Sequence, residues 1–214
     1  MKRFVSLILI VLLVLIGVNY FIDASTAGSK YALNSDLVKQ ITANVSGYTP
    51  LDKIPPDFVQ AIIAVEDHKF YKHHGFDIEA IGRAYLTNLE GGTISQGGST
   101  ITQQLAKNLF LSNEKTYMRK IKELLLAIRL ERLYTKNEIL EMYINVIYYG
   151  SDAYGIQAAS RIYFNKNASA LTRDECAMLA GLPQAPSLYN PKLHPALALQ
   201  RQKTVLILMK QHGN

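Results

Sequence analysis

Residue patterns that mark the start of a helix are the feature of this 214-residue sequence that most restricts the folds it can adopt. Thr135 with Glu138, and Thr172 with Glu175, have the spacing of a capping box, in which two side chains satisfy backbone N–H groups at a helix start. Pro56 suits the first position of another helix. Because no stretch alternates cleanly with a period of two, the sequence predicts a mainly α fold.

The expected helices follow from these signals and from apolar spacing. Thr100 or Ser99 can cap one of them, and Asp77 another. The predicted helices cover residues 55 to about 69, 77 to about 89, 99–110, about 116–133, 137–147, 174–182 and 195 to about 211.

The N-terminus carries a membrane signal. Residues 4–22 are apolar and uncharged, and at about 1.5 Å per residue they just span a hydrocarbon core of about 30 Å. We expect a cytoplasmic tail (1–3), a transmembrane signal-anchor (4–22), a linker and membrane-proximal segment (23–45) and an extracytoplasmic domain (46–214). A cleaved signal peptide is the alternative, since Ser25-Thr26-Ala27 resembles a cleavage site.

The net charge of +6 favours anionic partners. The sequence has no nucleic-acid-binding motif and no dense run of Lys and Arg, so we expect no nucleic acid. Membrane headgroups or a phosphorylated substrate fit the charge better.

The stretch VEDHKFYKHHG, residues 65–75, concentrates titratable side chains. Its histidines lack the i, i+4 spacing by which a helix face binds a metal, so we assign no metal ligands there. Glu66 follows the apolar run AIIAV, and partial desolvation there raises a carboxyl pKa towards the range of a general base. A solvated acid at a helix end is the alternative reading of Glu66 alone.

The stretch QGGSTITQQLAKNLF, residues 96–110, has glycines before a capped helix, where backbone N–H groups can face an anion. Gln103, Gln104 and Lys107 share a face of that helix. Uncharged polar residues suit sugar hydroxyls, and a plain exposed helix face remains the alternative.

The helix of about 116–133 carries apolar residues on more than one face. We expect its core stripe to be Ile121, Leu124, Leu125 and Ile128. Arg119 and Glu123 are i and i+4 on nearly the opposite face, beside Ala127 and Leu130. This arrangement is interpreted as the wall of a cleft, with an exposed ion pair as the alternative.

Taken together, these stretches resemble glycosyltransferase family 51, the peptidoglycan glycosyltransferases. The matching motifs are EDHKFYKHHG (66–75), GGSTITQQLAKNLFL (97–111), RKIKELLLAIRLE (119–131), ILEMYIN with Gly150 (139–150), and YFNKNASALTRDECAMLAGLPQAPSLYNP (163–191). The resemblance covers about residues 50–200. It departs mildly at Ile144, where Leu is usual, and at Asn165, where Gly is common. The resemblance leads us to expect a monofunctional member, without the transpeptidase domain of the bifunctional members.

The resemblance implies a mainly α, lysozyme-like domain with head and jaw lobes, the jaw formed by about residues 76–98. It implies a single-pass protein of the bacterial cell membrane with an extracytoplasmic catalytic domain, in a family that moenomycin targets. The implied reaction joins lipid II into β-1,4-linked glycan strands with inversion and releases undecaprenyl pyrophosphate. The implied partners are lipid II, the growing glycan strand, the bilayer and other cell-wall synthesis proteins.

The resemblance also assigns residue roles. Glu66 is the expected base and Glu123 the second carboxylate, with Asp67, Phe70 and His73 supporting. The residues expected to bind substrate or pyrophosphate are Ser99, Thr100, Gln103, Gln104, Lys107, Asn108, Arg119 and Lys120. Glu141, Tyr143 and Asn145 form a structural motif.

A divalent cation, Mg²⁺ or Mn²⁺, is expected to bind with the substrate pyrophosphate, near Glu123, without a set of ligands from protein side chains.

Two other functions stay open. A lysozyme-type glycoside hydrolase would use Glu66 and Glu123 to cut glycan, although the cations Lys107, Arg119 and Lys120 suit pyrophosphate release better. A non-catalytic membrane-anchored scaffold of cell-wall assembly would not need the two carboxylates.

Overall fold

The computed structural model describes residues 17, 19–80, 82, 98–112, 114 and 116–212. These residues form helices and no named β-strand, with one isolated bridge between Tyr148 and Tyr154, so the prediction of a mainly α fold is confirmed. The helices are α2 (Leu37–Asn44), α3 (Pro56–Glu66), α5 (Ile101–Phe110), α6 (Tyr117–Leu133), α7 (Lys136–Val146), α8 (Ile156–Phe164), α9 (Arg173–Ala180) and α10 (Pro195–His212), with the 3-10 turns η1 (Leu51–Lys53), η2 (Phe70–Lys72) and η3 (Ala168–Ala170).

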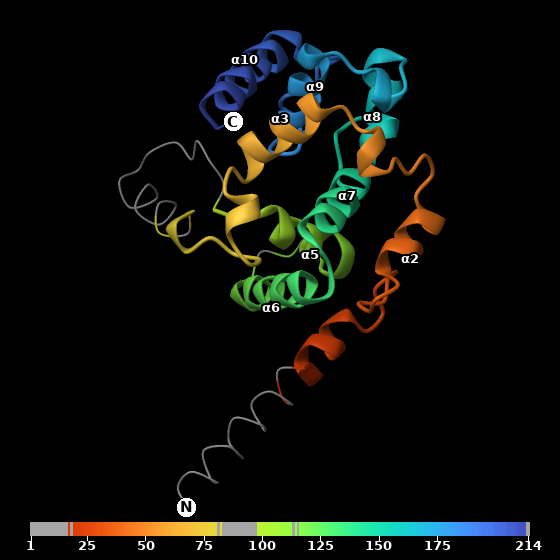
Figure 1. The fold of residues 1–214 in the computed structure, drawn as a ribbon, viewed down its shortest axis with the longest axis vertical. Coiled ribbons are helices and arrows are strands. Elements are labelled where there is room, and N and C mark those ends of the chain that lie inside the picture. The colour runs from red at the N-terminus through yellow and green to blue at the C-terminus, as the bar shows by residue number, and fades with distance from the viewer. Residues whose placement is uncertain are drawn as a thin grey trace, which may run out of the picture.

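Two groups of helices build the described part of the chain (Figure 1). In one group α3 packs against α9 and α10, and in the other α5 packs against α6 and α7. The helices α2 and α8 both contact α7. Glu66 and Asp67, at the end of α3, both form hydrogen bonds with residues of α5, so the end of α3 faces α5.

Local capping chemistry starts three of the helices. Thr135 with Glu138 and Thr172 with Glu175 form the predicted capping boxes at α7 and α9. A third box joins Thr100 to Gln103 at the start of α5. Such contacts span three residues, which is why the sequence alone located the boxes at α7 and α9.

The first predicted helix end is wrong by three residues, because α3 ends at Glu66 and not near Lys69. Asp67 has φ −162° and ψ 73°, outside the helical region. Its carboxylate accepts a hydrogen bond from the backbone N–H of Ile101, 34 residues away. This long-range contact pulls the chain out of the helix and leaves Glu66 as its last residue.

The helix expected at residues 77–89 is described only at its start. Asp77 Oδ1 accepts hydrogen bonds from the backbone N–H groups of Glu79 (2.9 Å) and Ala80 (3.1 Å), as a capping residue does. Residues 81 and 83–97, which make up most of the expected jaw, lie outside the described residues.

The core stripe expected for α6 is wrong. The residues that α6 buries are Glu123, Leu126, Ala127 and Leu130, while Ile121 is 50% exposed and Leu124, Leu125 and Ile128 are half-buried. The helix has apolar residues on both sides, so its periodicity did not decide which side faces α5. Packing against α5 turned the side with the Arg119–Glu123 pair inward.

The expected membrane span, residues 4–22, lies mostly outside the described residues, which include only 17 and 19–22 of it. In the ranges that are described, no helix combines the length and the apolar character needed to cross a bilayer. Residues 19–26 are helical and contact α6 through Arg129, which pairs with Asp23 at 3.1 Å. Leu37 and Ile41 are fully buried, so part of the segment expected as linker packs in the core.

Candidate active site

Glu66 is the last residue of α3, and its carboxyl contacts Gln104 on α5. Its side chain keeps some access to solvent, but burial of the carboxyl raises its pKa above the ordinary value. Weaker influences oppose burial: a hydrogen bond from Gln104 and the positive charges of Arg201 and Lys107. A carboxyl with a raised pKa beside hydrogen-bond donors is suited to accepting a proton near neutral pH.

A chain of hydrogen bonds orients this carboxyl. Gln104 Nε2 donates to Glu66 Oε2 at 2.7 Å, and the Tyr143 hydroxyl donates to Gln104 Oε1 at 3.1 Å. Since the phenol can donate to the amide oxygen, the amide nitrogen is left to face Glu66. Tyr143 is fully buried, and burial keeps its pKa well above the ordinary value, so it stays a neutral donor.

Asp67 and His73 fasten the loop that follows Glu66. His73 Nε2 lies 2.8 Å from Asp67 Oδ2, and the Gly75 N–H donates to His73 Nδ1 at 3.2 Å. Because Nδ1 accepts, Nε2 carries the proton and donates to Asp67. Phe70 is buried edge-on against His73. The geometry supports the expected positioning role of Asp67, Phe70 and His73.

Thr100 and Gln103 are engaged within the protein. Thr100 Oγ1 donates to the Gly75 carbonyl at 2.7 Å, and Gln103 Oε1 accepts from the Thr100 N–H at 2.9 Å. Both side chains are almost completely buried. They join the loop at Gly75 to the start of α5, and a direct contact with substrate stays a prediction for them.

A cluster of charges lies at the start of α6. Glu123 is 2% exposed, and its two carboxylate oxygens separately contact Arg119 Nη1 (2.6 Å) and Lys120 Nζ. Lys120 Nζ also donates to Ser99 Oγ at 2.8 Å. Glu123 therefore holds in place two cations, Arg119 and Lys120, whose side chains are more exposed than its own. Because the cluster contains two positive charges and one negative charge, its net charge is positive.

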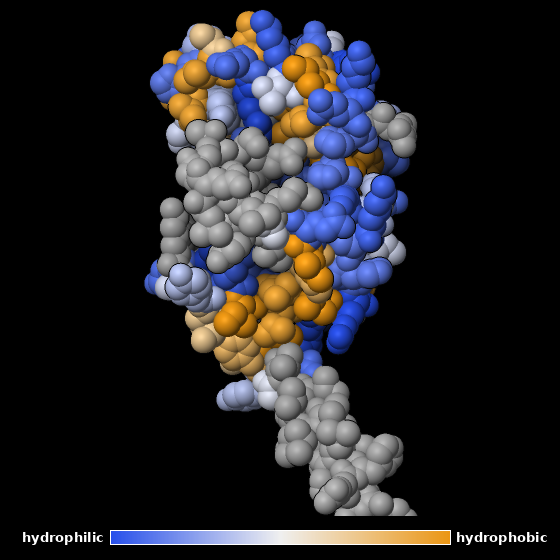
Figure 2. Space-filling model, turned by 90° about the vertical axis from the view of Figure 1, so that its left-hand side faces the viewer, coloured by the Kyte–Doolittle hydropathy of each residue, from blue (hydrophilic) through white to orange (hydrophobic). Residues whose placement is uncertain are grey.

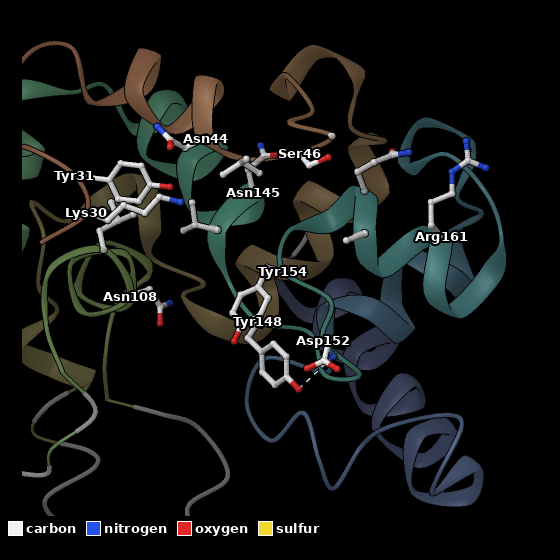
Figure 3. Close-up of a pocket in the computed structure, with 16 residues that line it drawn as sticks. Lys30, Tyr31, Asn44, Ser46, Asn108, Asn145, Tyr148, Asp152, Tyr154 and Arg161 are labelled. Carbon is white, nitrogen blue, oxygen red and sulfur yellow. Dashed lines mark hydrogen bonds between the residues drawn. The ribbon is translucent and has the colours of Figure 1, made fainter.

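Lys107 and Asn108 extend the exposed face of α5 beyond Gln104. Lys107 is half-buried and follows Gln104 by three residues, so the two share a face of α5, and the positive charge of Lys107 lowers the Glu66 pKa. Asn108 is exposed and borders a cavity at the end of α5 (Figure 3).

Glu141 and Asn145 hold the start of η1 and the residues just before it against α7. Glu141 Oε2 accepts from the Leu51 N–H at 2.7 Å, and Asn145 Oδ1 accepts from the Thr49 N–H at 2.8 Å. The arrangement suits the structural role expected of them.

Arg201 is a site residue that the sequence reasoning missed. It is 9% exposed on α10, its Nε donates to the Gly181 carbonyl at 3.3 Å, and its charge acts on Glu66. An arginine in the last helix, about 135 residues after Glu66, gives no local signal of this proximity.

The carboxylates and histidines of the described residues do not cluster as metal ligands do. Within the described ranges no group of three or more His, Cys, Asp or Glu side chains could hold a metal ion. His73 is bonded to Asp67, and His68 stacks on His212 with ring centroids 4.4 Å apart. Both oxygens of Glu123 face cations, so this site does not fit a metal held by protein side chains alone.

Comparison with known proteins adds a family match. A family model described as Transglycosylase matches residues 34–210. The chain is 54% identical over 166 residues to penicillin-binding protein 1A of Aquifex aeolicus (78% of this chain, 23% of that protein) and 44% identical over 227 residues to penicillin-binding protein 1F of Bacillus subtilis (99% and 32%). It is also 50% identical over 166 residues to a Cupriavidus necator protein described as a transglycosylase (78% and 71%). The chain thus spans a third or less of the two penicillin-binding proteins.

Proposed function

This chain belongs to the transglycosylase family, and on that basis we propose that it polymerises lipid II into β-1,4-linked peptidoglycan strands and releases undecaprenyl pyrophosphate. The observation that carries the proposal is the buried Glu66 carboxyl, held by Gln104 on the same side of α5 as Lys107. A proton acceptor and nearby cations are what an inverting transfer from a pyrophosphate donor needs.

Glu66 is the proposed base. Substrate with an α-linked pyrophosphate becomes a β-linked product, so one direct displacement suffices and no enzyme nucleophile is required. Glu66 takes the proton of the acceptor 4-hydroxyl as that oxygen attacks the anomeric carbon. Its raised pKa makes the carboxylate a stronger base, and Gln104 fixes the direction in which it points.

Lys107, Arg119 and Lys120 are the proposed cations for the leaving pyrophosphate. Glu123 positions the last two, and together the four side chains carry a net positive charge. Lys120 is 44% exposed along its side chain, so it can move towards an anion while Glu123 keeps Arg119 in place. Fixed positive charge of this kind stabilises the negative charge that develops on the leaving group.

The binding of a divalent cation, Mg²⁺ or Mn²⁺, together with the substrate stays a proposal. The protein side chains do not form a ligand set for it. Such an ion would be held by the pyrophosphate oxygens of the substrate, and no step of the mechanism above is assigned to it.

An exposed apolar area at the start of α6 supports the placement of the protein at a bilayer surface. Tyr117, Met118 and Ile121 at the start of α6 are all at least half exposed. Apolar side chains gather low on the globular part of the molecule in Figure 2, and α6 lies low on the same part in Figure 1. We propose that this face lies against the extracytoplasmic surface of the bacterial cell membrane, in a lysozyme-like head-and-jaw arrangement, where other cell-wall synthesis proteins could be reached.

One experiment separates the candidate functions. The purified full chain is given lipid II and, in a separate reaction, finished glycan. Polymer from lipid II with intact glycan is the expected result. Cleavage of glycan without polymerisation would establish the hydrolase instead, and turnover of neither substrate would favour a scaffold. Repeating the lipid II reaction with EDTA tests whether polymerisation requires a divalent cation.

A further inference from the structure

Residues 67–75, the segment that follows Glu66, are held by the start of α7. Lys136, the first residue of α7, places its Nζ over the ring of Phe70, 4.5 Å from the ring centroid. The next residue, Asn137, accepts a hydrogen bond through Oδ1 from the Tyr71 hydroxyl at 3.1 Å. Phe70 and Tyr71 belong to η2, so two consecutive residues of α7 hold two consecutive residues of η2.

A buried carboxylate fixes Lys136 in this position. Glu131 Oε1, near the end of α6, contacts Lys136 Nζ at 2.7 Å and accepts a hydrogen bond from Thr102 Oγ1 at 2.6 Å. The side chain of Glu131 is 6% exposed and that of Lys136 is 18% exposed. Because little water screens the ammonium group here, its attraction to the carboxylate and to the face of Phe70 is stronger than it would be at an exposed site.

The far end of the same segment lies against α6. Gly75 has φ 93°, in the region that favours glycine. A Cβ at this position would come within 3.3 Å of Glu131 Cγ and 3.2 Å of the Ala127 carbonyl oxygen. Glu131 therefore lies between the backbone at Gly75 and the lysine that covers Phe70, so one carboxylate supports the segment at two points.

A series of contacts connects Phe70 to the candidate base. The fully buried ring of Phe70 lies edge-on to the ring of His73, with centroids 6.2 Å apart. His73 Nε2 donates to Asp67 Oδ2 at 2.8 Å, and the same oxygen accepts from the Ile101 N–H at 3.0 Å. The Phe70 N–H also donates to the Asp67 carbonyl at 2.9 Å. Since Asp67 directly follows Glu66, the placement of Phe70 affects where the Glu66 carboxyl lies relative to α5.

We propose that Lys136, held by Glu131, is a positioning residue for the transfer reaction and acts through Phe70 on the segment after Glu66. This inference rests on the proposed function for its effect on turnover, whereas its effect on the order of residues 67–75 depends on no activity. A displacement of roughly 1 Å at a reacting group can reduce a rate by about 10²-fold. Loosening the segment should therefore lower kcat and leave KM nearly unchanged.

Steady-state kinetics with lipid II test this role. Lys136→Met keeps an unbranched side chain but removes the charge, and it is expected to reduce kcat by about 10–100-fold and to change KM by less than about twofold. Lys136→Arg, which can still pair with Glu131 and stack on Phe70, should recover most of the loss. Lys166→Met is the matched control, because Lys166 Nζ also contacts a carboxylate oxygen, that of Glu175 on α9, at 2.7 Å. Equal kcat in Lys136→Met and Lys166→Met would overturn the proposal.

A double-mutant cycle tests the route through Phe70. Phe70→Leu removes the ring that Lys136 covers. If Lys136 acts through that ring, the double variant should have a kcat within about twofold of the slower single variant. Losses that multiply would reject this route. Every variant is assayed at a temperature below the start of its thermal unfolding, so that a loss of folded protein does not lower the measured kcat.

Hydrogen exchange measures the positioning without any activity. Two backbone N–H groups of η2 donate to carbonyls within the segment, at 2.9 and 2.7 Å. Lys136→Met should speed exchange in a peptide that covers residues 67–75 by about threefold or more, and Lys166→Met should leave it unchanged. Equal exchange in the wild-type protein and Lys136→Met would refute the proposal. Faster exchange in Lys136→Met, without any polymer from the wild-type protein, would reject the proposed function and keep the role of Lys136 in holding the segment.

Discussion

Gln104 Nε2 donates a 2.7 Å hydrogen bond to Glu66 Oε2, and this contact joins the helix that carries the candidate base to the helix beneath it. Burial raises the Glu66 pKa, and the Gln104 bond partly offsets that rise. Gln104 thus sets both the direction of the carboxyl and its basicity, which are two separable, measurable effects.

Glu66→Gln is expected to reduce polymerisation of lipid II by about 10²–10⁴-fold or more, because the amide cannot accept the proton of the attacking hydroxyl. The far-UV spectrum should match that of the wild-type protein. Asp52→Asn, the same chemical change at an exposed position on η1, is the control and should retain activity. Near-normal turnover by Glu66→Gln would refute the base assignment.

The same variant should be more stable than the wild-type protein at high pH. The folded-state pKa of Glu66 is raised, so its contribution to stability is fully present below the unfolded pKa and is lost as pH rises through the folded pKa. The uncharged Gln avoids that loss. We expect the melting temperature of Glu66→Gln to exceed that of the wild-type protein by a few degrees at pH 8, and the difference to shrink towards pH 4. A difference independent of pH would contradict the raised pKa.

Gln104→Leu should shift the pH profile of kcat/KM. It removes the hydrogen bond that lowers the Glu66 pKa, so the pKa rises and the acidic limb of the profile moves to higher pH. Tyr143→Phe, which frees the Gln104 amide to turn, should move the limb in the same direction by less. An unmoved limb in Gln104→Leu would show that the bond does not tune Glu66.

Lys107→Ala should reduce kcat/KM for lipid II by about 10²–10³-fold, the size of effect seen when one group that stabilises developing charge is removed. Because Lys107 is half-buried and forms no ion pair in the described part of the chain, stability should change by less than about 0.5 kcal/mol. Lys107→Arg should recover part of the activity. Unchanged kinetics in the Ala variant would reject the pyrophosphate role.

The helix starts and the order of the motifs were predictable from the sequence, and the interior of the site was less so. Capping boxes such as Thr135 with Glu138 join residues three apart, so local sequence contains both partners. The early end of α3 was missed because the partner of Asp67 is the Ile101 N–H, which no local pattern connects to it. The buried side of α6 was missed because both of its sides are apolar, and only contact with α5 distinguishes them.

The sequence by itself therefore determined the mainly α class, the places where helices begin and the chemical groups that the family motifs bring. Those properties depend on side chains within a turn or two of one another. The tertiary structure alone decided that Gln104 faces Glu66, that Glu123 lies between two cations, that Arg201 acts on the same carboxyl as Gln104 and that the first residue of α7 covers an aromatic ring of η2. Except for the cations around Glu123, which are close in sequence, these relationships join separate helices. All of them depend on how the helices pack, and on the burial that this packing produces.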